Sequence, residues 1–228
     1  MVKNHLKRIS TPKTWKIGRK AETFISRPSP GGQPLLHSIS INTLFKEELK
    51  FAKTTKEVKN ILNKSEILVD GKQVKNYRYS IGLMDVVSIP KTKENYRLLL
   101  NKNGQLFAKS VKAAESNLKP KRITGKGKIA KGATQLQFFD GHNLKVDKDE
   151  YKVGDTVMYD IKDKKITSAL KLEKGALVYL TGGAHIGFVG TVEDLGTKKI
   201  HIKTEDKIFE TARRYAFVVG KDKPLIEI

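Results

Sequence analysis

Hydrophobic residues at helical spacing are concentrated in one short region of the chain. Residues 44–49 place apolar side chains on one helical face, and apolar residues recur at i, i+3 and i+4 over 58–62. Between these stretches, Thr54 and Glu57 have the spacing of a capping box, in which each side chain accepts a hydrogen bond from the other residue's amide. The pattern therefore predicts two helices, of which the second begins after Thr54.

From residue 67 onward the pattern is that of short strands separated by turns. The pair Asp70-Gly71 is typical of a two-residue hairpin turn, and Asn103-Gly104 separates the two apolar runs of the clearest hairpin in the chain. Five short runs with glycine between them after residue 173 indicate a small barrel. We expect strands in the segments 67–69, 86–89, 97–100, 106–108, 156–159, 176–180, 200–203, 208–211 and 215–219.

Changes in this pattern divide the chain into four segments. Residues 1–42 form an arm whose prolines and glycines interrupt any helix, and residues 43–91 form a small α/β module. Residues 92–172 are predicted to be an all-β central domain, and residues 173–228 a C-terminal β-barrel. The predicted fold class is therefore α+β and multi-domain. Since hydrophobic residues make up only 38% of the chain, several small cores are favoured over one large core.

Charge adds a functional expectation to this outline. The chain has 45 Lys and Arg residues against 24 Asp and Glu, a net charge of +21. Such an excess usually persists because a polyanion neutralises it. The net charge is concentrated in residues 1–42 and 92–172, with +7 and +9, and falls to +1 over residues 173–228. Uneven charge of this kind indicates contact surfaces rather than general solubility.

Several other classes of protein find little support in the sequence. There is no cysteine, and the five histidines lie far apart, so neither disulfides nor a metal site is expected. No apolar stretch reaches the roughly 18 residues of a membrane span, and no apolar run follows the N-terminal charges as in a secretory signal. Gly127 and Gly132 have the spacing of a nucleotide-binding loop, but the lysine that should follow is missing. No catalytic motif is present, and we expect no enzyme activity and no cofactor.

The N-terminal arm allows two interpretations. It can be a disordered tail, or an arm that becomes ordered on RNA, with its cations on phosphates. In the second case Trp15 would stack on a base or anchor the arm to the body of the protein. The candidate RNA-binding residues of the arm are Lys3, His5, Lys7, Arg8, Lys13, Trp15, Lys16, Arg19, Lys20 and Arg27.

Two more basic stretches are candidate RNA contacts, with a solvated surface as the alternative for each. Lysines recur at every third position from Lys50 to Lys59, next to a helix N-terminus, which favours phosphate. Residues 119–131 contain six basic residues, no acidic residue and two glycines, and are predicted to be a mobile loop that RNA neutralises. The candidate residues outside the arm are Lys53, Thr54, Lys56, Lys59, Lys72, Arg78, Lys119, Lys121, Arg122, Lys126, Lys128 and His185.

Three groups of motifs, in this order along the chain, resemble one known family. The first is His5-Leu6-Lys7-Arg8, Pro12-Lys13-x-Trp15 and Arg27-Pro28-Ser29. The second is Val69-Asp70-Gly71-Lys72 and Tyr77-Arg78-Tyr79-x-x-Gly82-Leu83-Met84-Asp85-Val86-Val87. The third is Thr181-Gly182-Gly183-Ala184-x-x-Gly187-x-x-Gly190. Together they resemble the archaeal and eukaryotic small-subunit ribosomal proteins of the four-e type, over essentially the whole chain.

The resemblance implies a specific set of functional properties. Residues 43–91 would be an alpha-L RNA-binding module and residues 173–228 a KOW-type barrel. The partners would be ribosomal RNA of the small subunit and neighbouring ribosomal proteins, in the cytoplasm, without a membrane, a small-molecule substrate, a metal or a cofactor. The alternatives are a translation or RNA-processing factor that binds RNA transiently and an RNA-modifying enzyme. The second is disfavoured because no segment remains for its catalytic domain.

Overall fold

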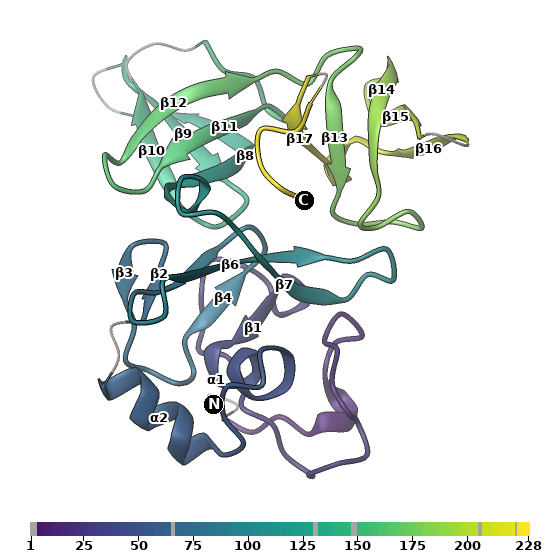
Figure 1. Ribbon diagram of the computed structural model, residues 1–228. Coiled ribbons are helices and arrows are strands. Elements are labelled where there is room, and N and C mark those ends of the chain that lie inside the picture. The colour runs from purple at the N-terminus through teal and green to yellow at the C-terminus, as the bar shows by residue number, and fades with distance from the viewer. Residues whose placement is uncertain (1–3, 65–66, 130–131, 147–149, 205–206, 222) are drawn as a thin grey trace. The chain divides into compact units, whose positions relative to one another are not determined.

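The computed structural model describes residues 4–64, 67–129, 132–146, 150–204, 207–221 and 223–228 (Figure 1). It consists mostly of β-strands and divides into two compact units. Unit 1 comprises Met1–Leu100 and Gly104–Asn117, and unit 2 comprises Asn101–Asn103 and Leu118–Ile228. The strand content confirms that the chain is β-rich, and the division confirms that it has more than one compact part.

The helices of unit 1 begin where the sequence places capping residues. Ser40 precedes α1 and its hydroxyl accepts a hydrogen bond from Thr43 N at 3.2 Å. The predicted capping box is confirmed, since Glu57 N donates to Thr54 Oγ1 at 3.2 Å at the start of α2. The helical elements are η1 (Arg8–Ser10), η2 (Leu35–His37), α1 (Ile41–Thr43), the π-helical turn η3 (Leu44–Glu48), α2 (Thr55–Lys64) and η4 (Glu115–Asn117).

A five-stranded antiparallel sheet with the order β3-β2-β5-β6-β7 forms the centre of unit 1. Its first hairpin turns at Asp70 and Gly71, which both have positive φ, as the predicted two-residue turn requires. The predicted hairpin around Asn103-Gly104 is formed by β6 and β7. The strands of unit 1 are β1 (Ser38–Ser40), β2 (Leu68–Val69), β3 (Lys72–Gln73), β4 (Ser80–Gly82), β5 (Val86–Ile89), β6 (Glu94–Leu100) and β7 (Leu106–Ser110).

This sheet crosses one of the predicted segment boundaries. Val86↔Arg97 and the following pairs join β5 to β6, so residues on both sides of position 91 belong to the same sheet. The sequence placed the β6–β7 hairpin with the central domain because the turn after Ile89 interrupts the apolar pattern. Pairing between strands, which the local pattern does not record, assigns this hairpin to unit 1.

The N-terminal arm is part of the core of unit 1, which corrects the prediction that it is poorly structured. Trp15 is 2% exposed, and its Nε1 donates to the carbonyl of Ser38 at 2.9 Å. Leu106 N donates to Thr14 O at 2.6 Å, which ties the arm to the edge strand β7. The arm lacks a periodic apolar pattern because it is held by single anchors and main-chain bonds rather than by one apolar face. Trp15 is therefore an anchor, and its ring is not available for stacking on a base.

The first part of unit 2 is a five-stranded antiparallel sheet with the order β10-β9-β8-β11-β12. Its core consists of Ile123, Leu136, Phe138 and Val157. The predicted loop over residues 119–131 is wrong for its first ten residues, because Leu118–Lys128 form the long strand β8. Pairing with β9 and β11 on its two sides supplies the order that the local sequence lacks. The strands are β8, β9 (Thr134–Phe138), β10 (Asn143–Val146), β11 (Thr156–Asp160) and β12 (Lys165–Leu170).

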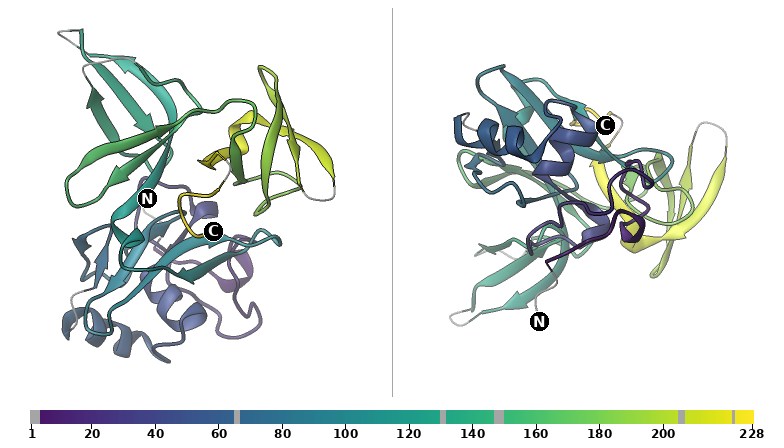
Figure 2. Two further views of the ribbon diagram at one scale, coloured as in Figure 1. Left: turned by 45° about the horizontal axis from the view of Figure 1, so that its top comes forward. Right: turned by 90° about the horizontal axis from the view of Figure 1, so that it is seen from below.

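The second part of unit 2 is a curved antiparallel sheet with the order β16-β15-β14-β13-β17 (Figure 2). The four strands predicted with bounds are present and β14 is the fifth, but no ladder pairs the described residues of β16 with those of β17, so the closed barrel is not confirmed. Gly187, with φ +79°, passes so close to the carbonyl of Asn101 that a Cβ would lie 2.2 Å from the oxygen. The elements are β13 (Leu177–Leu180), β14 (Val189–Leu195), β15 (Lys199–Lys203), β16 (Ile208–Ala212), η6 (Arg213–Tyr215) and β17 (Ala216–Gly220).

Candidate nucleic-acid interface

A polar cavity of about 320 Å³ in unit 1 brings together residues that are far apart in the sequence. The arm contributes Arg8 and Arg27, the helical segment contributes Lys46, and the turn before β4 contributes Arg78. Three of these four cations were candidate RNA-binding residues. We refer to this hollow and its lining residues as the arm cavity.

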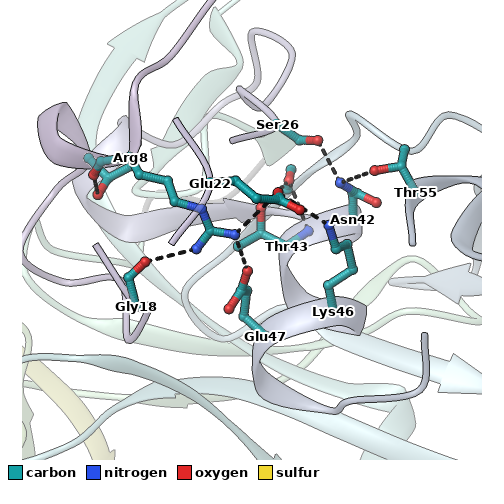
Figure 3. Close-up of polar contacts among 11 residues, drawn as sticks. Arg8, Gly18, Glu22, Ser26, Asn42, Thr43, Lys46, Glu47 and Thr55 are labelled. Atoms are coloured by element: carbon teal, nitrogen blue, oxygen red, sulfur yellow. Dashed lines mark hydrogen bonds and ion pairs between the residues drawn. The ribbon is translucent and has the colours of Figure 1, made fainter. Parts of the chain in front are cut away.

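Arg8 organises one wall of the arm cavity (Figure 3). It is 4% exposed, and its guanidinium donates to Glu47 Oε1 at 2.6 Å and to the carbonyl of Gly18 at 3.1 Å. Glu22 lies between this arginine and Lys46, at 3.7 Å and 3.8 Å from the two cationic groups. Buried charges require such pairing because the loss of solvation is costly. Arg8 therefore holds the arm against the helical segment and is not an exposed phosphate contact.

Asn42 forms the buried end of a hydrogen-bond network in the same cavity (Figure 3). Its side-chain Nδ2 donates to Ser26 Oγ at 2.5 Å and lies 3.4 Å from Thr55 Oγ1. Its Oδ1 is buried without a hydrogen-bond partner. An unsatisfied buried acceptor costs about 1–3 kcal/mol, so this amide is a strained feature of the free protein.

Two further cations, Arg78 in the lining and Lys59 beside it, are held by neighbouring groups. Arg78 donates from Nε to the carbonyl of Arg27 at 3.2 Å and from Nη2 to the carbonyl of Asn4 at 3.0 Å. Lys59 Nζ lies 4.6 Å from the centre of the Tyr77 ring, which lines the cavity. The carbonyls of Arg27 and Asn4 thus hold the Arg78 guanidinium, and the Tyr77 ring holds the Lys59 ammonium group.

The N-terminus of α2 lies beside the arm cavity through Thr55. Glu57 accepts from Lys53 N at 2.8 Å and from the Thr54 hydroxyl at 2.9 Å, and these hydrogen bonds lower the pKa of its carboxyl group. Lys53, Thr54, Lys56 and Lys59 are all exposed. The capping box therefore uses Thr54 structurally, while the lysines around it remain accessible to an anion.

The first two lysines of the central segment have a different environment. Lys119 and Lys121 each place Nζ 3.3 Å from Asp140 Oδ2, and all three side chains are at most 6% exposed. Burial raises the pKa of Asp140, but the hydrogen bond with His142 and the charges of Lys119 and Lys121 outweigh it and hold the pKa well below its usual value. Residues 119–131 contain no acidic residue, and the carboxylate comes from Asp140, which follows β9, the strand that pairs with β8.

The remaining candidates of unit 2 divide between structural and accessible positions. Arg122 Nη1 donates to the carbonyls of Arg214 and Ala216, and burial lowers the pKa of its guanidinium. Lys128 is exposed and Lys126 is half-buried, at the far end of β8. His185 stacks on the Phe209 ring with the centroids 3.9 Å apart. Among the described residues of the predicted segment, only the end of β8 therefore offers an accessible cation, and Lys131 lies outside the described residues.

The other candidates lie mostly on the surface. Arg19 is half-buried and donates to the carbonyls of Ile9, Thr11 and Pro12, which closes a turn of the arm. Lys3 lies outside the described residues. The exposed candidates are His5, Lys7, Lys13, Lys16, Lys20 and Lys72.

Sequence reasoning did not select several residues of the arm cavity. Asn42 and Ser26 are uncharged, and nothing in their local pattern distinguishes them from ordinary surface or core residues, while Tyr77 was noted only as part of a family motif. Phe24 was not among the candidate residues, yet it lines the cavity and is 52% exposed. An aromatic residue in a stretch without an apolar period was the one available signal.

Metal-ligand clusters and membrane-spanning helices are both absent from the described part of the chain. Residues 4–64, 67–129 and the later described ranges contain no group of three or more histidine, aspartate or glutamate residues able to hold a metal ion. None of the helices formed by these residues is long and apolar enough to cross a membrane.

Comparison with known proteins identifies relatives over the whole chain. The model of the ribosomal family S4e matches residues 92–166, and that of the RS4NT domain matches residues 2–32. Small ribosomal subunit protein eS4 from Methanosphaera stadtmanae is 39% identical over 232 residues, covering 99% of this chain and 96% of the relative. The protein of the same name from Archaeoglobus fulgidus is 37% identical over 237 residues, covering 100% and 99%.

A solved structure agrees with these sequence matches. The crystal structure of the 30S ribosomal protein S4e from Thermoplasma acidophilum has a TM-score of 0.71 and 26% identity, covering 81% of this chain and 96% of that one. Fold and charge define a basic, multi-domain, β-rich protein. The chain belongs to the small ribosomal subunit protein eS4 family, which confirms the resemblance seen in the sequence.

Proposed function

We propose that this protein is a structural, non-catalytic constituent of the small ribosomal subunit, and that it binds ribosomal RNA during assembly in the cytoplasm. Relatives that carry the name of a small-subunit ribosomal protein over their whole length support this role. Residues 43–91 act as an alpha-L RNA-binding module and residues 173–228 as a KOW-type domain. The partners are ribosomal RNA and neighbouring ribosomal proteins.

The observation that carries the RNA-binding part is the convergence of cations around the arm cavity. Arg27, Arg78 and Lys59 come from three segments, and the fold brings them to one side of unit 1. Within a protein of net charge +21, such convergence suits a phosphate backbone better than a single small anion. Buried Arg8, Lys119 and Lys121 position the fold, and direct contacts are assigned to the exposed cations, including Lys53, Lys56 and Lys128.

Salt titration of binding to small-subunit ribosomal RNA tests this role. Each neutralised phosphate adds about −0.9 to the log–log slope on duplex RNA, by analogy with B-DNA. We expect the double substitution Arg27→Gln and Lys59→Gln to weaken binding and to make the slope shallower by roughly 1–2 units. The control is Lys162→Gln with Lys165→Gln, which removes the same charge from exposed positions at the β11–β12 turn. Equal slopes for both variants would contradict the assignment to the arm cavity.

A transient RNA-binding factor is the alternative function. Sedimentation of ribosomal particles after a high-salt wash separates the two, because a structural constituent stays with the small subunit and a factor leaves it. Loss of the protein from washed small subunits would refute the structural role.

A further inference from the structure

The arm cavity has properties beyond those of a phosphate contact. Phe24 lines it with a ring that is 52% exposed, and the His5 ring lies 5.8 Å away. Phe51, the other exposed phenylalanine of unit 1, is 42% exposed but packs edge-on against Phe45 and Tyr96. Exposed aromatic rings beside cations are the usual platforms on which unpaired bases stack.

The hydrogen-bonding groups of the cavity point to a ligand with acceptors and donors. Asn42 Nδ2 donates to the hydroxyl oxygen of Ser26 and lies within reach of that of Thr55, which leaves each hydroxyl hydrogen available for an acceptor. Asn42 Oδ1 still lacks a donor. This oxygen is closed to solvent, so a ligand N–H is met instead by the remaining lone pairs of the Ser26 and Thr55 hydroxyl oxygens. The polar edge of a nucleobase carries both kinds of group.

The volume and the charge of the arm cavity further restrict the class of ligand that it can bind. The volume of about 320 Å³ lies within the range of about 300–1,000 Å³ typical of small-molecule sites, and exceeds the needs of a lone phosphate. The lining contains Arg8, Arg27, Lys46 and Arg78 against two carboxylates, Glu22 and Glu47, an excess of positive charge. A flat base attached to a phosphate matches this combination. Base faces are accessible only when the nucleotide is unpaired.

We propose that the arm cavity receives one unpaired nucleotide of an RNA strand. The base lies beside Phe24 with its polar edge toward Ser26, Asn42 and Thr55, and the phosphate lies against Arg27 and Arg78. This inference rests on the proposed RNA-binding function. It adds recognition of a base to contacts between cationic side chains and the phosphate backbone of RNA, which carry no sequence information.

Binding of the full-length protein to three RNA hairpins tests the inference. One hairpin is fully paired, one carries a single bulged nucleotide, and one carries an abasic residue at the bulge. We expect about tenfold tighter binding of the bulged hairpin than of the other two, in line with the effect of stacking a single base. Phe24→Leu should remove most of this preference, whereas the matched substitution Phe51→Leu should leave it unchanged. Thermal melting of both variants verifies that they fold.

Each outcome has a defined consequence. Equal binding of the bulged and abasic hairpins means that only the phosphate is bound and overturns the inference, while leaving RNA binding intact. Tight, saturable binding of free adenosine monophosphate that displaces the bulged hairpin would identify a mononucleotide site and also overturn it. Failure of all hairpins and of ribosomal RNA to bind would refute the proposed function and this inference together.

Discussion

Two basic stretches of this chain, the N-terminal arm and the segment that forms β8, have similar composition and opposite environments. In β8, Lys119 and Lys121 are buried, and each lies 3.3 Å from the carboxylate of Asp140. In the arm, one cation, Arg8, is buried and paired, and Arg27 remains half-buried at the edge of a cavity. A basic sequence is therefore not equivalent to a basic surface.

The difference arises from where acidic residues lie in the folded chain. Strand pairing brings Asp140 close to β8. Its carboxylate lies 3.3 Å from the ammonium groups of two lysines of that strand. In unit 1, Glu22 and Glu47 pair with Arg8, whereas the guanidinium of Arg78 in the same cavity donates to the backbone carbonyls of Arg27 and Asn4. Substitution of a cation that stabilises the fold should lower the free energy of unfolding. Substitution of a cation that contacts a ligand should weaken binding and leave stability unchanged.

The largest expected effect comes from removing the carboxylate of β8's ion cluster. Asp140→Asn should lower the free energy of unfolding by about 3–5 kcal/mol, since the negative charge that lies 3.3 Å from two buried ammonium groups is removed. Urea denaturation measures this, with Asp163→Asn as a control at an exposed turn position. The comparison fails if both substitutions cost less than about 0.5 kcal/mol, the usual range for surface changes.

The same carboxylate makes stability depend on pH. Its folded-state pKa is lowered from an ordinary value of 3.8, so the stabilisation is present above that value and is lost as pH falls through the folded-state pKa. The stability difference between the parent protein and Asp140→Asn should therefore shrink as pH falls from about 6 to about 2. Urea midpoints at several pH values provide the measurement. A difference that stays constant over this range would show that Asp140 does not titrate as described.

Anchoring of the arm gives a smaller effect on stability. Trp15→Phe removes the donor to the Ser38 carbonyl and should cost about 1–3 kcal/mol, because that buried acceptor loses its partner. The melting temperature is measured by circular dichroism rather than by tryptophan fluorescence, because Trp15 is the only tryptophan and the substitution removes it. Lys13→Ala, at an exposed position of the arm, should leave the melting temperature unchanged. Equal melting of Trp15→Phe and the parent would restore the interpretation of a loosely held arm.

The smallest expected effect concerns the helix that borders the arm cavity. Thr54→Ala removes the acceptor for Glu57 N and should destabilise the protein by about 1 kcal/mol. Thr54→Ser keeps a capping hydroxyl and should retain most of the stability. Denaturant unfolding of the two variants distinguishes a cap from a general effect of the position. A similar loss in both would point to the threonine methyl group instead.

Much of the local structure follows from short stretches of sequence. The capping box at Thr54, the positive-φ turn at Asp70-Gly71 and the β6–β7 hairpin depend on neighbouring residues, so their patterns predicted them correctly. The family was likewise evident from motifs spread along the chain. These features depend on interactions within a few residues, or on a pattern that needs no folding to be recognised.

The environment of each charge depends on contacts between distant segments. Asp140 neutralises Lys119 and Lys121 only because β9 pairs with β8, and Trp15 becomes an anchor only because the Ser38 carbonyl comes within 2.9 Å of it. Asn42, Ser26 and Phe24 form one cavity although their local patterns have nothing in common. Composition shows how many cations the chain has, whereas burial and pairing, which arise in three dimensions, determine which of them are available to bind RNA.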